Sequence, residues 1–100
     1  MRTYEKALDA LGDHTRRLIF ARLAAAPRSV GELADGLPVS RPAVSQHLRT
    51  LTLAGLVMSR PDGARRVYAV NPSALSELRA YFDGLRRSAA DGFDRAGQSP

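Results

Sequence analysis

Hydrophobic residues recur at a helical period through the first third of the chain. They predict a first amphipathic helix over residues 3–11, with an apolar face made of Tyr4, Ala7, Leu8 and Leu11. Asp13 is a suitable N-cap for a second helix, which Pro27 brings to an end. The stretch Ser29-Val30-Gly31-Glu32 matches the S-x-x-E capping box, which opens a short third helix. Residues 28–30 leave room for a short strand between the second and third helices.

Two arginines, Arg16 and Arg17, lie in the first turn of the second helix. The positive end of a helix disfavours cations, so both side chains are expected to find acceptors outside that helix. The acidic residues Asp13 and Glu5 are the expected partners within the chain. A phosphate is the functional alternative.

A fourth helix is predicted from Ser40 onward, and its two faces differ. Apolar residues recur at i, i+4 and i+7 on one face, namely Val44, Leu48 and Leu51. The other face carries donors and acceptors but no acid, namely Arg41, Ser45, Gln46, Arg49 and Thr52. Ser40 can cap the first turn, Pro42 is tolerated within it, and Gly55 suits the left-handed position after the last turn. Arginine, serine and glutamine contact base edges and phosphates, so the pattern predicts a DNA recognition helix.

Residues 36–39 form a tight connection between the third and fourth helices. Two short helices joined by a turn of about four residues, the second polar on its outer face, are typical of a helix-turn-helix.

The hydrophobic period changes after Gly55. Residues 56–60 and 65–70 are β-prone, and the turn residues Pro61-Asp62-Gly63 between them predict a β-hairpin. The tip carries three arginines that repel one another and would gain from an external anion, namely Arg60, Arg65 and Arg66. A solvated loop is the alternative. The position of the hairpin directly after the recognition helix favours a wing that contacts the DNA backbone or minor groove.

The last helix is predicted to begin at Asn71-Pro72, an N-cap followed by a proline in the first turn. Its apolar seam is too long for one small core to cover, and Phe93 extends it further. Together with the first helix it predicts a dimer interface made of Tyr4, Leu8, Leu11, Leu75, Leu78, Phe82, Leu85 and Ala89. The alternative is that both helices pack only onto their own core. We expect one domain over residues 1–94 and a disordered tail over residues 95–100.

The composition supports an anionic partner. The 100 residues include 15 Lys+Arg and 10 Asp+Glu, which gives a formal net charge of +5. A basic small domain favours nucleic acid or an anionic membrane, although a merely base-rich protein would show the same balance. No helix combines a basic face with a large aromatic one, which argues against a membrane surface. With no apparent signal peptide or membrane span, a soluble cytoplasmic protein is expected.

Several chemistries lack the residues they need. The chain has no cysteine, which excludes a disulfide scaffold, a thiol switch and a thiolate metal site. Two scattered histidines and no glycine-rich phosphate loop argue against an enzyme. A protein-interaction module that has lost DNA binding is the remaining alternative. The absence of acids between Asp35 and Asp62 favours DNA over that alternative.

The order of elements and several motifs resemble the ArsR-type winged helix-turn-helix transcriptional regulators. The matching stretches, within about residues 5–88, are Leu11-Gly12-Asp13-His14-Thr15-Arg16-Arg17-Leu18-Ile19, Val30-Gly31-Glu32-Leu33-Ala34, residues 39–48, Ala54-Gly55-Leu56-Val57 and residues 63–68. The resemblance implies a homodimeric DNA-binding repressor, paired through its first and last helices. It also suggests the protein's own promoter as a target, and activation is the alternative to repression.

The resemblance also raises the question of a metal site, because family members often respond to a metal or an oxidant. The family's thiolate site corresponds to residues 30–36, which hold no cysteine. Its other site uses histidines and carboxylates of the last helix, which here holds Asp83, Asp91 and Asp94 but no histidine. We therefore expect no metal and no cofactor, as in a metal-independent branch. A small-molecule effector near Tyr81 and Phe82 is an alternative to plain interface packing there.

The predicted fold is thus mainly α-helical, with about five helices and a small β-hairpin wing, and its partners are double-stranded DNA and a second copy of the chain. Arg49 suits guanine and Gln46 suits adenine, whereas side chains near the helix N-terminus and on the wing suit phosphates. The residues expected to contact DNA are Ser40, Arg41, Pro42, Ser45, Gln46, His47, Arg49, Thr50, Arg65, Arg66 and Tyr68.

Overall fold

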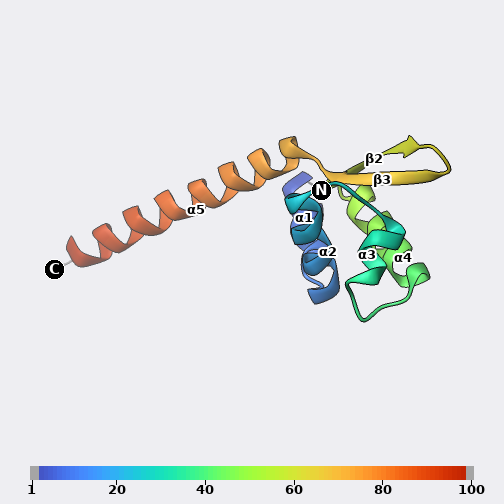
Figure 1. The fold of residues 1–100 in the computed structure, drawn as a ribbon. Helices are drawn as coiled ribbons and strands as arrows, with labels where there is room; N and C mark the ends of the chain where they lie inside the picture. The colour runs from blue at the N-terminus through green and yellow to red at the C-terminus, as the bar shows by residue number, and fades with distance from the viewer. Residues whose placement is uncertain (1–2, 99–100) are drawn as a thin grey trace.

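The computed structural model describes residues 3–98, which form five α-helices and one three-stranded sheet (Figure 1). This architecture confirms the prediction of a mainly helical fold with a β-hairpin. The elements are α1 (Thr3–Ala10), α2 (His14–Ala25), β1 (Arg28–Ser29), α3 (Val30–Asp35), α4 (Arg41–Leu53), β2 (Val57–Asp62), β3 (Arg65–Val70) and α5 (Pro72–Gln98).

The helices begin where side chains can cap them. The Asp13 carboxylate accepts a hydrogen bond from the backbone N–H of Arg16 at 2.9 Å, at the start of α2. Ser29 and Glu32 form the expected capping box at the start of α3, and Ser40 caps α4. Each cap satisfies a backbone donor that has no partner within its helix. These three helix caps were correctly predicted from the sequence.

The hairpin differs from the prediction in its turn. Strand β2 continues through Pro61 to Asp62, and residues 63 and 64 alone connect it to β3. The strand order is β1-β3-β2, so β2 lies at an edge, where a proline without an N–H is tolerated. Gly63 has φ of +63°, a left-handed conformation that suits the first position of a two-residue turn. The predicted turn was therefore placed too early.

Helix α4 supplies the centre of the core. Its apolar residues Val44, Leu48 and Leu51 are fully buried, and Ile19 of α2 and Leu33 of α3 pack into the same cluster. Gly55 follows α4 with φ of +78°, as the predicted C-terminal position requires. The buried face of α4 thus fixes the direction in which its opposite face is presented.

Helix α5 begins against α1 and then projects away from the other elements (Figure 1). The molecule is consequently elongated, with extents of 67 × 25 × 25 Å. The helix continues through Arg95 to Gln98, so the disordered tail predicted from residue 95 is wrong for residues 95–98. No proline interrupts the sequence between Pro72 and Pro100, so helical hydrogen bonding can continue. Residues 99 and 100 of that predicted tail lie outside the described residues.

Candidate nucleic-acid interface

The solvent face of α4 carries the side chains that the sequence assigns to DNA. Arg41, Gln46 and Arg49 are exposed, and their side chains form no hydrogen bond or ion pair with other described residues. Ser40, Pro42 and Ser45 are exposed on the same helix or at its cap. The first turn of α4 contains no acid, so its exposed backbone N–H groups add to the positive potential. This face can donate hydrogen bonds to an anionic surface along its length.

Two predicted contacts on α4 are less accessible. Thr50 is half-buried, and its hydroxyl donates to the backbone oxygen of Gln46 at 3.3 Å. His47 is also half-buried, and its Nδ1 lies 3.4 Å from Nη1 of Arg16. Arginine offers donors only, so in this contact Nδ1 of His47 serves as the acceptor. His47 therefore contacts α2 as well as bordering the outer face of α4.

The wing hairpin β2–β3 lies beside α4 and completes a concave surface. A hollow of about 330 Å³ separates the two elements and is lined by Ser45, Arg49, Thr52, Leu53, Ser59 and Tyr68. The fold thus brings Ser45, Arg49 and Tyr68 to one surface, as the predicted interface requires. Ser59 also lines this hollow. It was not predicted to do so, because nothing in its local sequence distinguishes it from an ordinary strand residue.

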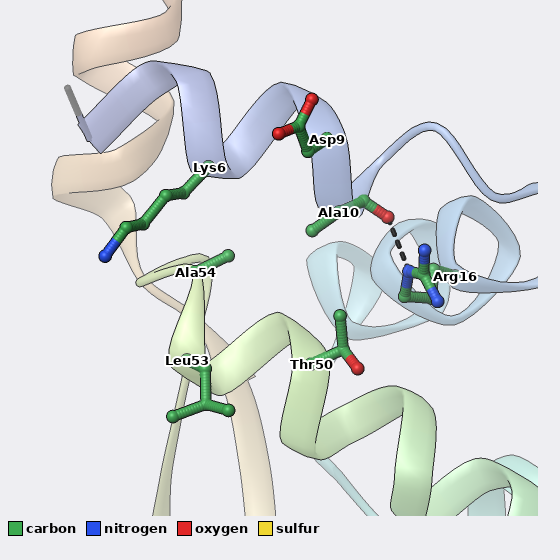
Figure 2. Close-up of a pocket in the computed structure, with 7 residues that line it drawn as sticks. All are labelled: Lys6, Asp9, Ala10, Arg16, Thr50, Leu53 and Ala54. Atoms are coloured by element: carbon green, nitrogen blue, oxygen red, sulfur yellow. Dashed lines mark hydrogen bonds between the residues drawn. The ribbon is translucent and has the colours of Figure 1, made fainter. Parts of the chain in front are cut away.

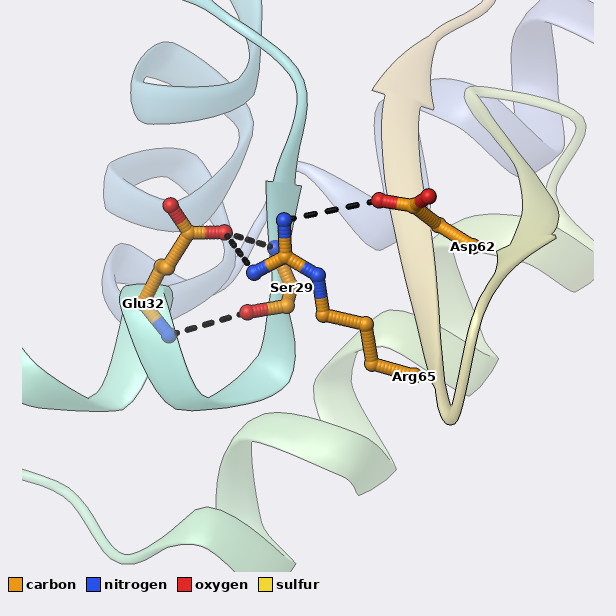
Figure 3. A network of polar contacts seen from close by, with 4 residues as sticks. All are labelled: Ser29, Glu32, Asp62 and Arg65. Atoms are coloured by element: carbon orange, nitrogen blue, oxygen red, sulfur yellow. Dashed lines mark hydrogen bonds and ion pairs between the residues drawn. The ribbon is translucent and has the colours of Figure 1, made fainter.

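The arginines at the hairpin tip are partnered to different degrees (Figure 3). Arg65 makes two ion pairs, one from Nη1 to Glu32 Oε1 at 3.2 Å and one from Nη2 to Asp62 Oδ2 at 3.4 Å. Arg66 donates from Nη1 to the Ser59 hydroxyl at 3.1 Å. Within the described residues, Arg60 has no hydrogen bond or ion pair. Arg65 therefore has anionic partners within the chain, whereas the expected gain from an external anion stays a prediction for Arg60 and Arg66.

A second hollow adjoins the tip, between α3, the start of α4 and the wing. It measures about 490 Å³, and its charged lining consists of Arg41, Arg65, Arg66, Glu32 and Asp35. The backbone N–H and hydroxyl of Ser29 hold the pKa of Glu32 below its usual range, and the Arg65 guanidinium adds to that effect. Glu32 is therefore ionised at neutral pH and offsets part of the arginine charge.

Arg16 and Arg17 have partners within the chain, but these are not the predicted carboxylates. Nε of Arg16 donates to the backbone oxygen of Ala10 at 2.6 Å (Figure 2), and Nη1 of Arg17 donates to that of Leu11 at 2.8 Å. The last carbonyls of a helix lack intrahelical donors and carry partial negative charge, so they attract cations. The sequence signal was available, because both arginines follow closely after the end of α1.

Arg16 also borders a hollow of about 380 Å³ between α1 and the C-terminal half of α4 (Figure 2). The backbone N–H of Arg16 lowers the pKa of Asp13 from its ordinary value, and the guanidinium charge contributes further. Through its contacts with the Ala10 carbonyl and with Nδ1 of His47, Arg16 connects the end of α1 to the recognition helix.

The predicted dimer residues divide into two groups. Leu78 is 8% exposed and belongs to the core of its own chain, and Tyr4 stacks on Tyr81 with ring centroids 4.4 Å apart. Leu8 and Leu11 are half-buried. The side chains that remain exposed along α5 include Leu75, Phe82, Leu85, Ala89 and Phe93.

Residues 3–98 contain no group of three or more histidine, cysteine, aspartate or glutamate side chains placed to hold a metal ion. Among the helices they form, none has the length and apolarity needed to cross a membrane.

A polar helix on a helical core, preceded by a short helix and followed by a β-hairpin, defines the winged helix-turn-helix class of DNA-binding proteins. Residues 11–60 match a family model described as a helix-turn-helix domain. The HTH-type transcriptional regulator Rv2034 of Mycobacterium tuberculosis is 52% identical over 92 residues, which cover 92% of this chain and 86% of the regulator. The HTH-type transcriptional repressor SmtB of the same species is 36% identical over 78 residues, covering 71% and 58%.

The solved structures give the same result. An ArsR-like transcriptional regulator from Rhodococcus sp. RHA1 superposes with a TM-score of 0.77 and 33% identity, covering 95% of this chain and 87% of that one. The chain belongs to the ArsR family of winged helix-turn-helix transcriptional regulators. It is therefore a DNA-binding regulator of transcription.

Proposed function

We propose that this chain is a homodimeric repressor that binds a palindromic operator, with one α4 helix in the major groove of each half-site. The exposed, acid-free face of α4 carries this proposal, because its arginines and glutamine are unpartnered within the described residues. Two half-sites separated by one helical turn, about 34 Å, or by a small multiple would match a two-fold dimer.

The proposed contacts follow from the chemistry of each side chain. Arg49 would pair with guanine and Gln46 with adenine, since each side chain is suited to bidentate contact with that base. Phosphates near the helix start would be held by Ser40, Arg41 and Ser45. Pro42, His47, Thr50 and Tyr68 would lie at the borders of the contact. Arg66 would reach the backbone from the wing.

The exposed stripe of α5 supports the dimer. Two large apolar side chains of this helix are exposed, namely Phe82 at 53% and Phe93 at 80%. A second copy of α5 and α1 would cover these side chains and provide the second recognition helix. Repression by occlusion of a promoter, including the chain's own, is consistent with SmtB being named a repressor. Acting on the chromosome, the protein would work in the cytoplasm, without a metal or cofactor.

The test is a gel-shift and footprint on the DNA upstream of the coding sequence, at about 150 mM salt with excess nonspecific competitor. Parent protein, Arg49→Ala and Arg87→Ala would be compared. Arg87 is an exposed arginine of α5, so its removal changes the net charge equally without touching α4. The proposal predicts a competitor-resistant, roughly palindromic footprint that only Arg49→Ala weakens, by about 1–3 kcal/mol.

Binding that salt abolishes, or that Arg87→Ala weakens as much as Arg49→Ala does, would contradict specific recognition. Selection from random DNA would then decide whether an operator exists elsewhere. If no sequence is enriched, the protein-interaction alternative would replace the proposal.

A further inference from the structure

Arg65 and Arg66 are adjacent in β3, yet they belong to opposite faces of the wing. Successive residues of a strand alternate between faces, and directly paired residues of two strands share a face. Arg66 shares its face with Tyr68 and with Ser59, which both line the hollow against α4. Arg65 pairs with Asp62 and lies on the other face. Both arginines line the hollow beside the start of α4, but only Arg66 shares its strand face with the residues that line the hollow against the outer face of α4.

A single oxygen connects Arg65 to the start of α3. Oε1 of Glu32 accepts from the backbone N–H of Ser29 at 3.0 Å and from Nη1 of Arg65 at 3.2 Å (Figure 3). Because the Ser29 contact belongs to the capping box, the position of this oxygen is fixed by the helix itself. Across residues 3–98, no other hydrogen bond or ion pair joins the wing tip, residues 60–66, to α3 or α4.

The positive charge of Arg65 is already neutralised within the chain. Glu32 and Asp62 each contact one of its terminal nitrogens. A phosphate approaching this guanidinium would meet two carboxylates at close range, and like charges oppose such an approach. Among the described residues, no carboxylate forms an ion pair with Arg66, and its one side-chain hydrogen bond there is to a serine hydroxyl.

We infer that Arg65 is a positioning residue of the wing and that Glu32 is its partner: the ion pair sets the wing tip relative to α3 and α4, and Arg66 meets the DNA backbone. The inference rests on the proposed function and replaces the role of DNA ligand that the sequence suggested for Arg65. Both members of the pair are about half exposed, so its loss should weaken DNA binding by no more than about fivefold.

The decisive variant is Glu32→Gln. Glutamine still accepts from the Ser29 N–H, so the capping box is kept while the charge that holds Arg65 is removed. The general electrostatic effect of losing an acid near DNA is tighter binding. A positioning role predicts the opposite sign, namely weaker binding of about two- to fivefold. Asp35→Asn is the matched control. Asp35 lines the hollow between α3, the start of α4 and the wing, as Glu32 does, but it forms no ion pair with Arg65.

Operator affinities at several salt concentrations complete the test. Arg66→Gln should reduce the slope of log K against log salt by about one unit per subunit, whereas Arg65→Gln should leave it unchanged. Combining Glu32→Gln with Arg65→Gln should weaken binding no further than Arg65→Gln alone. Tighter binding by Glu32→Gln, or equal loss of slope in both arginine variants, would make Arg65 a phosphate ligand and overturn the inference.

A measurement on the free protein separates this inference from the proposed function. The ¹⁵N heteronuclear NOE of residues 62–66 should fall in Glu32→Gln and Arg65→Gln and stay at the parent value in Asp35→Asn. Unchanged values in all three variants would refute the positioning role, whatever DNA the protein binds. Failure of the parent to bind an operator would instead refute the proposed function and leave this measurement to decide the role of Arg65.

Discussion

Replacing Phe82 by alanine should weaken self-association far more than it weakens the fold. The side chain is 53% exposed, and complete burial of a phenylalanine covers roughly 150–250 Å², so about 80–130 Å² remains for a partner to cover. At about 25 cal/mol per Å² this area corresponds to about 2–3 kcal/mol in each subunit. A two-fold interface contains the residue twice, which doubles the effect to about 4–6 kcal/mol per dimer. Ordering of side chains at the interface reduces that value, and we expect at least about a hundredfold increase in the dimer Kd.

Sedimentation equilibrium over a dilution series would measure the Kd, and circular dichroism would verify that the variant is folded. The Phe82 ring has one aromatic contact in its own chain, an edge contact with Tyr81 at a distance of 5.3 Å between ring centroids. Phe82→Ala should therefore lose little folding stability. Leu53→Ala is the control, because Leu53 is 71% exposed but lies on α4. A parent that stays monomeric, a Kd for Phe82→Ala within threefold of the parent, or an equal effect of Leu53→Ala would each refute the α5 interface.

Two further predictions concern stability. Leu48 is fully buried, so Leu48→Ala should lower the free energy of unfolding by about 2–5 kcal/mol in urea titrations, and a loss below about 1 kcal/mol would contradict its place in the core. The pKa of Asp13 is lowered in the fold by the Arg16 N–H, so the ionised carboxylate stabilises the protein above the ordinary value of 3.8, and this contribution is lost as the pH falls through the folded pKa. Asp13→Asn keeps a cap but should flatten this acid dependence; an identical difference from the parent at every pH would refute the assignment.

The parts of the fold predicted correctly depend on interactions close in sequence. A capping box spans four consecutive positions, and Ser29 and Glu32 satisfy it irrespective of the remaining chain. The buried face of α4 follows from the spacing of Val44, Leu48 and Leu51 alone. The acid-free outer face of that helix follows from the same spacing, whereas its contact with DNA stays a prediction.

The errors arise where tertiary contacts choose between equivalent local options. Helical spacing placed Tyr4 on an apolar face, but it did not reveal that Tyr81, far away in the sequence, stacks on Tyr4 within the same chain. The place of Tyr4 in a dimer interface stays a prediction. Periodicity identifies an apolar face without specifying what covers it. The partners of Arg16 and Arg17 were missed because only charged acceptors were considered, whereas the end of α1 offered backbone carbonyls.

The contrast between Arg65 and Arg66 shows why a cluster of like charges does not define a binding site by itself. In sequence the two arginines are equivalent, and shifting the strand register by one residue would exchange their faces. The observed register places Arg65 opposite Asp62 and within reach of Glu32. An acid 33 positions earlier in the chain therefore separates the roles we infer for these neighbours, and only the pairing of β3 with β2 could reveal it. If that is correct, removing the charge of Glu32 should weaken DNA binding only while Arg65 is present.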